Sequence, residues 1–260
     1  MRVVVLGGNG KLGRLLAPVF PRPVTWLTRN DVDIRNGNSL RDALTGADAV
    51  LCLAGVTHRR PEPMDANVDL ARNTLDAARD VGAGRVFLFS SAAVYGHLSG
   101  ALSEDGPTAP LSPYGKSKLV MEKMAAGHAH PNTVLRLGNV AGADAILGGW
   151  KPGFTLDTLA DGSTPRRSYI GPERLAGVLA DLCAVHSLPA LMNVAAPGSV
   201  EMGALLEAAQ KDWQPRPAQA ETIAQVTLDT SRLEQFIDFA PNDSRADGIV
   251  ADWRKATTTR

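Results

Sequence analysis

A glycine-rich segment close to the N-terminus constrains the fold of this 260-residue chain more than any other feature. Gly7, Gly10 and Gly13 have the spacing G-x-x-G-x-x-G directly after the apolar run Val3–Leu6. A strand that turns through such a loop into a helix needs glycine at the tight turn, where a phosphate approaches the backbone, and where helix and strand pack closely. The first amides of the helix then face the phosphates. We therefore predict a dinucleotide-binding loop, with a turn that merely needs positive φ as the alternative.

Short β-branched runs alternate with segments of helical periodicity along the first 200 residues. This alternation predicts an α/β fold, a Rossmann-type doubly wound parallel sheet with helices on both faces and right-handed crossovers. The expected strands are Val3–Leu6, Val24–Leu27, Ala49–Leu53, Arg85–Phe89, Thr133–Leu137 and Met192–Val194. The expected helices are Lys11–Phe20, Ser39–Leu44, Val68–Val81, Tyr114–Ala126 and Pro172–Ala184.

The regular rhythm stops after Val140. Residues 141–164 are rich in glycine and small side chains, which predicts a loop or insertion, and Gln214–Pro217 reads as a proline-rich connector. We expect a nucleotide-binding domain of residues 1–142 plus about 165–196. A small C-terminal substrate lobe would then comprise about 143–164 plus 197–260. Its expected helices are Met202–Lys211, Thr230–Phe236 and Arg245–Lys255.

Composition narrows the class of protein. Lys plus Arg and Asp plus Glu both number 27, so the formal net charge is zero and nothing favours a nucleic acid or an anionic membrane as partner. Cys52 and Cys183 lie in apolar runs and are expected to be buried thiols. No uninterrupted apolar segment is long enough to span a bilayer, and the scattered histidines predict no metal site. We expect a cytoplasmic protein with a small-molecule substrate.

The residue that follows the second strand indicates which dinucleotide is bound. A carboxylate there would hold the ribose 2′-hydroxyl of NAD, whereas arginine favours NADP. The strand Val24–Leu27 is followed by Thr28 and then by Arg29, with no acid at the strand end. This favours NADP as the cofactor, with NAD as the alternative if Asp31 reaches the ribose and Arg29 is solvated.

Three polar side chains suggest acid–base chemistry. Tyr114 and Lys118 are four residues apart and share one face of a helix, and Ser91 follows the strand Arg85–Phe89. A neighbouring ammonium stabilises a phenolate, so we expect Lys118 to lower the pKa of Tyr114 and make it a usable proton carrier. A serine hydroxyl can orient the same substrate oxygen. Alone, the Tyr–Lys pair would be read as an amphipathic helix surface.

Together, these motifs resemble the extended short-chain dehydrogenase/reductase family, the NAD(P)-dependent epimerase/dehydratase group. The resemblance rests on the glycine loop, on Ser90–Gly96 (SSAAVYG) and on Tyr114–Lys118 (YGKSK), and extends to about residue 200. It implies Ser91, Tyr114 and Lys118 as catalytic residues that accompany hydride transfer. Matching the motifs implies these cofactor-binding residues: Gly7, Asn9, Gly10, Lys11, Leu12, Gly13, Arg29, Asp33, Ile34, Leu53, Ala54, Gly55, Asn67, Ser90, Tyr114 and Lys118.

The predicted function is therefore an NAD(P)-dependent oxidoreductase of a sugar-like or small carbonyl substrate: an epimerase, dehydratase or reductase. The alternative is a silent NADP-binding sensor or scaffold. Lys151, Arg166 and Arg167 are candidates to hold a substrate anion. The chain departs from the family at Gly171 and at Arg174, where the family often has a larger residue and Asp, respectively. The resemblance also implies a homodimer formed by two helices of each subunit.

Overall fold

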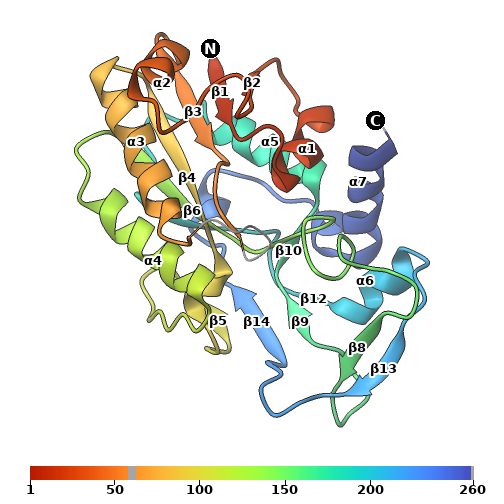
Figure 1. Ribbon diagram of the computed structural model, residues 1–260. Helices are drawn as coiled ribbons and strands as arrows, with labels where there is room; N and C mark the ends of the chain where they lie inside the picture. The colour runs from red at the N-terminus through yellow and green to blue at the C-terminus, as the bar shows by residue number, and fades with distance from the viewer. Residues whose placement is uncertain (58–62, 259–260) are drawn as a thin grey trace.

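Six parallel strands form the central sheet of the computed structural model, which describes residues 1–57 and 63–258 (Figure 1). Their order in space is β11-β6-β4-β3-β1-β2. Because the chain moves in opposite directions from β1 to β2 and from β1 to β3, the switch point lies at the carboxyl end of β1, where doubly wound folds bind ligands. The strands agree with the predicted ones to within two residues: β1 (Val3–Leu6), β2 (Thr25–Leu27), β3 (Ala49–Cys52), β4 (Arg85–Ser91), β6 (Asn132–Leu137) and β11 (Leu191–Val194).

Helices cover both faces of this sheet, as Figure 1 shows. Val4 and Leu6 of β1 pack with α2 (Gly37–Leu44), α3 (Ala66–Asp80) and α4 (Pro113–Ala126). Val3 and Val5 point the other way, toward α1 (Lys11–Leu16) and α5 (Pro172–Leu182). Successive side chains of a strand face opposite sides, so a run of apolar residues supplies both cores. None of the helices in the described part of the chain is long and apolar enough to cross a membrane.

The second half of the chain contains strands that the sequence did not predict. Within the expected insertion, β8 (Thr155–Thr158) pairs with β13 (Gln214–Pro217), so the interpretation of the latter as a connector is wrong. β13 is exposed and sits at the edge of a two-stranded sheet, where proline is tolerated. The remaining strands, most of two residues and too short for a periodic pattern, are β5 (Ala101–Leu102), β7 (Asn139–Val140), β9 (Arg166–Arg167), β10 (Tyr169–Ile170), β12 (Val200–Glu201) and β14 (Gln225–Leu228).

The late helices are only partly as expected. α6 (Met202–Ala208) and α7 (Ala246–Thr258) are present, but the helix predicted at residues 230–236 is a single 3-10 turn, Leu233–Gln235. Leu233 and Ile237 pack into the core beneath the central sheet, on the same side as α5. Tertiary packing of these two side chains, rather than helical periodicity, therefore fixes this segment.

The unusual residue at position 171 has a structural reason. A β-carbon added to Gly171 would lie 2.3 Å from a carboxylate oxygen of Asp252, which belongs to α7. That carboxylate accepts hydrogen bonds from the backbone amides of Glu173, at 2.6 Å, and Arg174, at 2.8 Å. The last helix thus caps the N-terminus of α5, and glycine leaves room for the cap.

Candidate active site

The glycine loop forms the turn that its spacing predicts. The backbone amides of Gly7 and Gly8 both donate to the carbonyl of Leu27, at 2.9 Å, which holds the loop against β2. Gly7 has a φ of +94°, and a β-carbon there would lie 2.8 Å from the amide nitrogen of Ala54. A β-carbon on Gly13 would lie 2.5 Å from the carbonyl oxygen of Gly8. Glycine is therefore required for backbone conformation at one position and for close packing at the other.

A cleft of about 490 Å³ opens above this loop, at the carboxyl ends of β1, β2 and β3. We call it the dinucleotide cleft. Nine of the residues expected to bind a cofactor line it: Gly7, Asn9, Gly10, Arg29, Asp33, Ile34, Leu53, Ala54 and Gly55. Arg14 and Arg35 also line it, and sequence reasoning missed both because neither lies at a motif position.

Four other expected cofactor residues have different surroundings. The ammonium group of Lys11 donates to the carbonyls of Ala143 and Asp144, at 2.8 and 3.2 Å. Leu12 packs against the core on the α5 side of the sheet. Asn67 is buried and binds both backbone groups of Val56. The hydroxyl of Ser90 donates to a carboxylate behind the sheet rather than facing the cleft.

Asp31 and Arg29, the two residues that the sequence analysis weighed for the choice of dinucleotide, differ in orientation. The carboxylate of Asp31 accepts hydrogen bonds from the amide and hydroxyl of Thr28, at 2.8 and 2.6 Å. Both hydrogen bonds lower the pKa of Asp31, and the one from the Thr28 hydroxyl has the larger effect. Asp31 is therefore turned onto its own loop and does not line the cleft, whereas Arg29 does.

Ser91, Tyr114 and Lys118 meet beside the dinucleotide cleft. Ser91 ends β4, and Ser112 caps α4 by accepting from the amide of Gly115 at 3.0 Å, with Pro113 in the first turn. The hydroxyls of Ser91 and Tyr114 are hydrogen-bonded to each other. The Lys118 nitrogen lies 5.8 Å from the centre of the Tyr114 ring and would lie 3.4 Å from a β-carbon on Gly55, a cleft residue.

Burial controls the protonation of this group. Burial raises the pKa of Tyr114, and the hydrogen bond from Ser91 opposes it only in part. The expectation that Lys118 lowers this pKa is therefore wrong, because burial outweighs the effect that lowers it. Lys118 is itself only 6% exposed, and burial lowers its pKa to about 8, against the opposing effects of Cys52 and Glu122. At neutral pH Tyr114 is a neutral phenol beside an ammonium group, an arrangement suited to giving a proton away.

A buried ion pair holds α4 against the sheet on the side away from the cleft. Glu122 lies one turn after Lys118 on α4. The guanidinium of Arg136, in β6, donates to the carboxylate of Glu122 at 2.7 Å, and the side chains of Glu122 and Arg136 are 7% and 4% exposed. Ser90 donates to the other carboxylate oxygen of Glu122 at 2.5 Å. The pair therefore connects α4, which carries Tyr114, to the end of β4, which carries Ser91.

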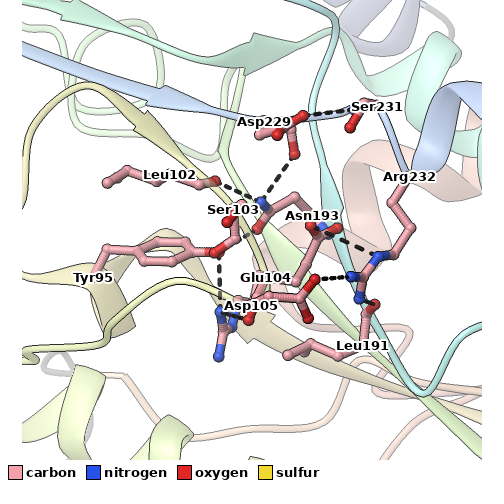
Figure 2. Close-up of polar contacts among 11 residues, drawn as sticks. Tyr95, Leu102, Ser103, Glu104, Asp105, Leu191, Asn193, Asp229, Ser231 and Arg232 are labelled. Atoms are coloured by element: carbon pink, nitrogen blue, oxygen red, sulfur yellow. Dashed lines mark hydrogen bonds and ion pairs between the residues drawn. The ribbon is translucent and has the colours of Figure 1, made fainter.

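The same arginine extends this support toward the C-terminal half of the chain. Arg136 donates to the hydroxyl of Tyr95 at 3.0 Å, and that hydroxyl lies 2.8 Å from the side-chain oxygen of Asn193. Figure 2 shows that Tyr95, Asn193 and Glu104 lie side by side. The carboxylate of Glu104 accepts a hydrogen bond from the backbone amide of Asn193 at 2.7 Å and lies near Arg232. These contacts give Tyr95, a buried residue of the Ser90–Gly96 segment, a structural role.

A second cleft begins at Ser91 and runs along the strands of the C-terminal half. We call this space of about 280 Å³ the catalytic cleft. It adjoins a wider groove of about 550 Å³ bordered by Phe154 and Asp157, and Arg167 lines both. Of the three candidate anion-binding residues, Arg167 lies here, whereas Arg166 pairs with Glu201 at 3.1 Å and Lys151 lines neither space.

Comparison with known proteins gives a consistent set of relatives. The profile of the NAD dependent epimerase/dehydratase family matches residues 3–149, more than half of the chain. A UDP-glucose 4-epimerase of Azospirillum brasilense is 39% identical over 109 residues, which cover 37% of this chain and 31% of the epimerase. A dTDP-glucose 4,6-dehydratase of Streptomyces griseus is 27% identical over 265 residues, which cover 91% of this chain and 79% of the dehydratase.

Solved structures give the same fold. The dTDP-glucose 4,6-dehydratase DesIV of Streptomyces venezuelae, determined with NAD and TYD bound, superposes with a TM-score of 0.75 at 23% identity, covering 99% of this chain and 97% of that one. This similarity confirms the predicted Rossmann-type fold.

Proposed function

The chain belongs to the NAD dependent epimerase/dehydratase family, and from this premise we propose that it is an NADP-linked oxidoreductase of nucleotide-bound sugars. Family membership confirms the class of enzyme predicted from the sequence. The proposed reaction interconverts a hydroxyl-bearing and a carbonyl carbon. The observation that carries the proposal is the meeting of Ser91, which lines the catalytic cleft, with Tyr114 and with Lys118, whose ammonium lies near Gly55 of the dinucleotide cleft.

Each residue of the three has a separate task in carbonyl reduction. When bound, NADPH supplies the hydride. Tyr114, which burial keeps protonated, gives its proton to the carbonyl oxygen as the hydride reaches the carbon. Ser91 donates a hydrogen bond to the same oxygen and fixes its position. The ammonium of Lys118 stabilises the phenolate that Tyr114 becomes, and in the opposite direction it helps that phenolate to act as the base.

The dinucleotide cleft supports NADP as the preferred form of the cofactor. Arg14, Arg29 and Arg35 line it, and Asp33 is the one acid among its described lining residues, because Asp31 binds Thr28 instead. A 2′-phosphate carries the charge that these guanidinium groups complement. A charge-assisted hydrogen bond contributes about 1.5–3 kcal/mol, so Arg29→Ala should weaken NADPH binding by roughly 10- to 100-fold and leave NADH binding nearly unchanged. Fluorescence titration measures both, and equal loss for the two cofactors would refute the role of Arg29.

Arg167 supports a nucleotide-linked sugar as substrate. Its guanidinium donates to the carbonyl of Arg166 at 2.7 Å, and no carboxylate in the described ranges pairs with it. It lies at the junction of the catalytic cleft and the wider groove, where a diphosphate would sit if the sugar reached Ser91. The named relatives include enzymes of UDP-glucose and dTDP-glucose.

The lining of the catalytic cleft argues against loss of water from the sugar. Elimination needs an acid to protonate the departing hydroxyl. Ala92 and Ala93 follow Ser91, and the described residues that line this cleft include no carboxylate and no imidazole. The geometry therefore favours a reductase or an epimerase over a dehydratase.

Turnover of nucleotide-linked 4-keto-hexoses with NADPH, followed by absorbance, tests for a reductase. Chromatography of nucleotide-linked hexoses incubated with the protein and NADP tests for an epimerase, because epimerisation leaves the cofactor without net change. We expect Tyr114→Phe to bind NADPH normally and to lower turnover by roughly 100- to 10,000-fold. A wild-type protein that binds NADPH but turns over none of the nucleotide sugars offered would favour the alternative of a silent sensor. The predicted homodimer is a further proposal; α4 exposes Val120, which is 53% accessible, and sedimentation of the purified protein tests it.

A further inference from the structure

A lysine in the glycine loop contacts a segment of the chain more than 130 residues away. Lys11 follows the second glycine of the loop, yet it is not among the described residues that line the dinucleotide cleft. Its ammonium group donates to the backbone carbonyls of Ala143 and Asp144, at 2.8 and 3.2 Å. A β-carbon on Gly148 would lie 2.9 Å from the Lys11 nitrogen, so this segment passes close to the ammonium group. We call residues 143–148 the bridging loop.

The carboxylate of Asp144 holds the bridging loop in place. It accepts hydrogen bonds from the backbone amides of Ile146, Leu147 and Gly148, at 3.0 to 3.3 Å. It also accepts a hydrogen bond from the hydroxyl of Tyr169 at 2.9 Å, and Tyr169 is only 1% exposed. Hydrogen bonds to a charged acceptor are stronger than those between neutral groups. The bridging loop and β10, which contains Tyr169, are therefore fixed to each other.

This unit of loop and strand borders the space that a substrate would occupy. Ile146 lines the wider groove, and Arg167, two residues before Tyr169, lines both that groove and the catalytic cleft. Ile146 also packs in one apolar cluster with Leu156, another residue of the groove. Lys11 thus connects the loop predicted to bind the dinucleotide to the segment that borders the wider groove.

We infer that Lys11 is a positioning residue for the nucleotide part of the substrate, and not a ligand of the cofactor. The inference rests on the proposed function, because it assumes that a nucleotide-linked sugar occupies the wider groove. Reacting atoms must come within about 3–3.5 Å of each other, so the two parts of the chain that hold the two ligands need a fixed separation. The hydrogen bonds of Lys11 fix it. Without them, binding of the substrate would have to order the wall of the groove, which lowers affinity.

Replacing Lys11 by methionine tests this inference, because methionine is similarly long and flexible but has no donor. UDP and dTDP serve as probes of the groove, since the named relatives include enzymes of UDP-glucose and dTDP-glucose. Isothermal titration calorimetry on protein saturated with NADPH measures the dissociation constant of each. For whichever diphosphate the wild type binds, Lys11→Met should raise this constant by roughly 2- to 10-fold, the equivalent of one net hydrogen bond. Lys11→Arg keeps a cationic donor and should recover most of the affinity.

A lysine elsewhere in the chain provides a matched control. Lys255 also joins distant segments, since it pairs with Glu173 at 2.7 Å. Neither residue lines the dinucleotide cleft, the catalytic cleft or the wider groove. Lys255→Met should therefore bind the diphosphate as the wild type does. NADPH affinity, measured by fluorescence titration, should be unchanged in all three variants.

The outcomes separate this inference from the proposed function. Weaker diphosphate binding in Lys11→Met, recovered in Lys11→Arg and absent from Lys255→Met, supports the inference. Unchanged diphosphate binding in Lys11→Met refutes it and leaves the proposed function standing. A loss of NADPH affinity in Lys11→Met also refutes it, because Lys11 would then be a ligand of the cofactor. A wild-type protein that binds neither diphosphate refutes the proposed substrate class and this inference with it.

Discussion

Replacing Glu122 by glutamine tests the buried ion pair that supports the active site. Glutamine keeps the shape of the side chain and an oxygen that can accept from Ser90, so the substitution removes little except the charge. Arg136 then keeps its positive charge at 4% exposure with no carboxylate beside it. Burial lowers the pKa of this guanidinium and Glu122 raises it in the wild type. Arginine keeps its proton in proteins even without such a partner, so Arg136 does not escape the penalty by becoming neutral.

The expected loss is large because both side chains are shielded from water. Removing one partner of a buried ion pair costs about 3–5 kcal/mol, since the other charge remains unpaired. For a chain of this size a loss of 1 kcal/mol lowers the melting temperature by about 2 °C, so Glu122→Gln should melt about 6–10 °C below the wild type. Thermal unfolding followed by circular dichroism measures this shift, and urea unfolding gives the free energy directly.

Glu173→Gln provides a matched control. Glu173 pairs with Lys255 at 2.7 Å, the same distance as in the buried pair, but the two side chains are 44% and 64% exposed. Exposed pairs contribute about 0–1 kcal/mol, so this variant should melt within about 2 °C of the wild type. Equal shifts for Glu122→Gln and Glu173→Gln would refute the reasoning, because burial would then make no difference to the value of the pair.

Three further outcomes follow from the described contacts. Gly13→Ala should abolish NADPH binding in a fluorescence titration, because the new β-carbon would lie 2.5 Å from the carbonyl oxygen of Gly8 in the loop. Gly177→Ala in α5 should instead raise the free energy of unfolding by about 0.5–1 kcal/mol, because no neighbouring atom would lie nearer than 3.8 Å to its β-carbon. NADPH affinity should fall as pH rises through about 8, because Lys118 loses its charge there; a decline only near 10.5 would contradict its burial. The pKa of Lys118 in the folded protein lies below its ordinary value of 10.5. Its contribution to the free energy of unfolding is therefore complete above about pH 10.5 and is lost as the pH falls through about 8. Asp252→Ala should cost about 1–2 kcal/mol in urea unfolding, because two amides of α5 lose their acceptor, and an unchanged midpoint would contradict the cap.

The central sheet and the helices that cover it could be predicted in detail because their signals are local. Each strand of the central sheet is a short apolar run, and the helices have periodic faces, so Val3–Leu6 and Pro172–Leu182 could be located without tertiary information. The strands outside the central sheet lack such signals. β9 and β10 are two residues long, and β13 contains two prolines, so only pairing with distant segments makes them strands.

The support behind the active site was equally beyond local reasoning. Glu122, Arg136, Tyr95 and Asn193 are separated by many residues in the chain and share no motif. Their charges and hydroxyl groups become a network only where α4, β6 and β11 pack together. The direction of the pKa of Tyr114 was missed for the same reason, since the sequence shows that a lysine is near but not how deeply the phenol is buried.

Spacing within one or two neighbouring elements was enough to predict the class of fold, the glycine turn and the three residues proposed to act on the substrate. Tertiary structure alone decided how those residues are charged and what surrounds the substrate. Burial depends on chain segments far apart in sequence, and both the pKa of an ionisable group and the polarity of a cleft wall are properties of that burial.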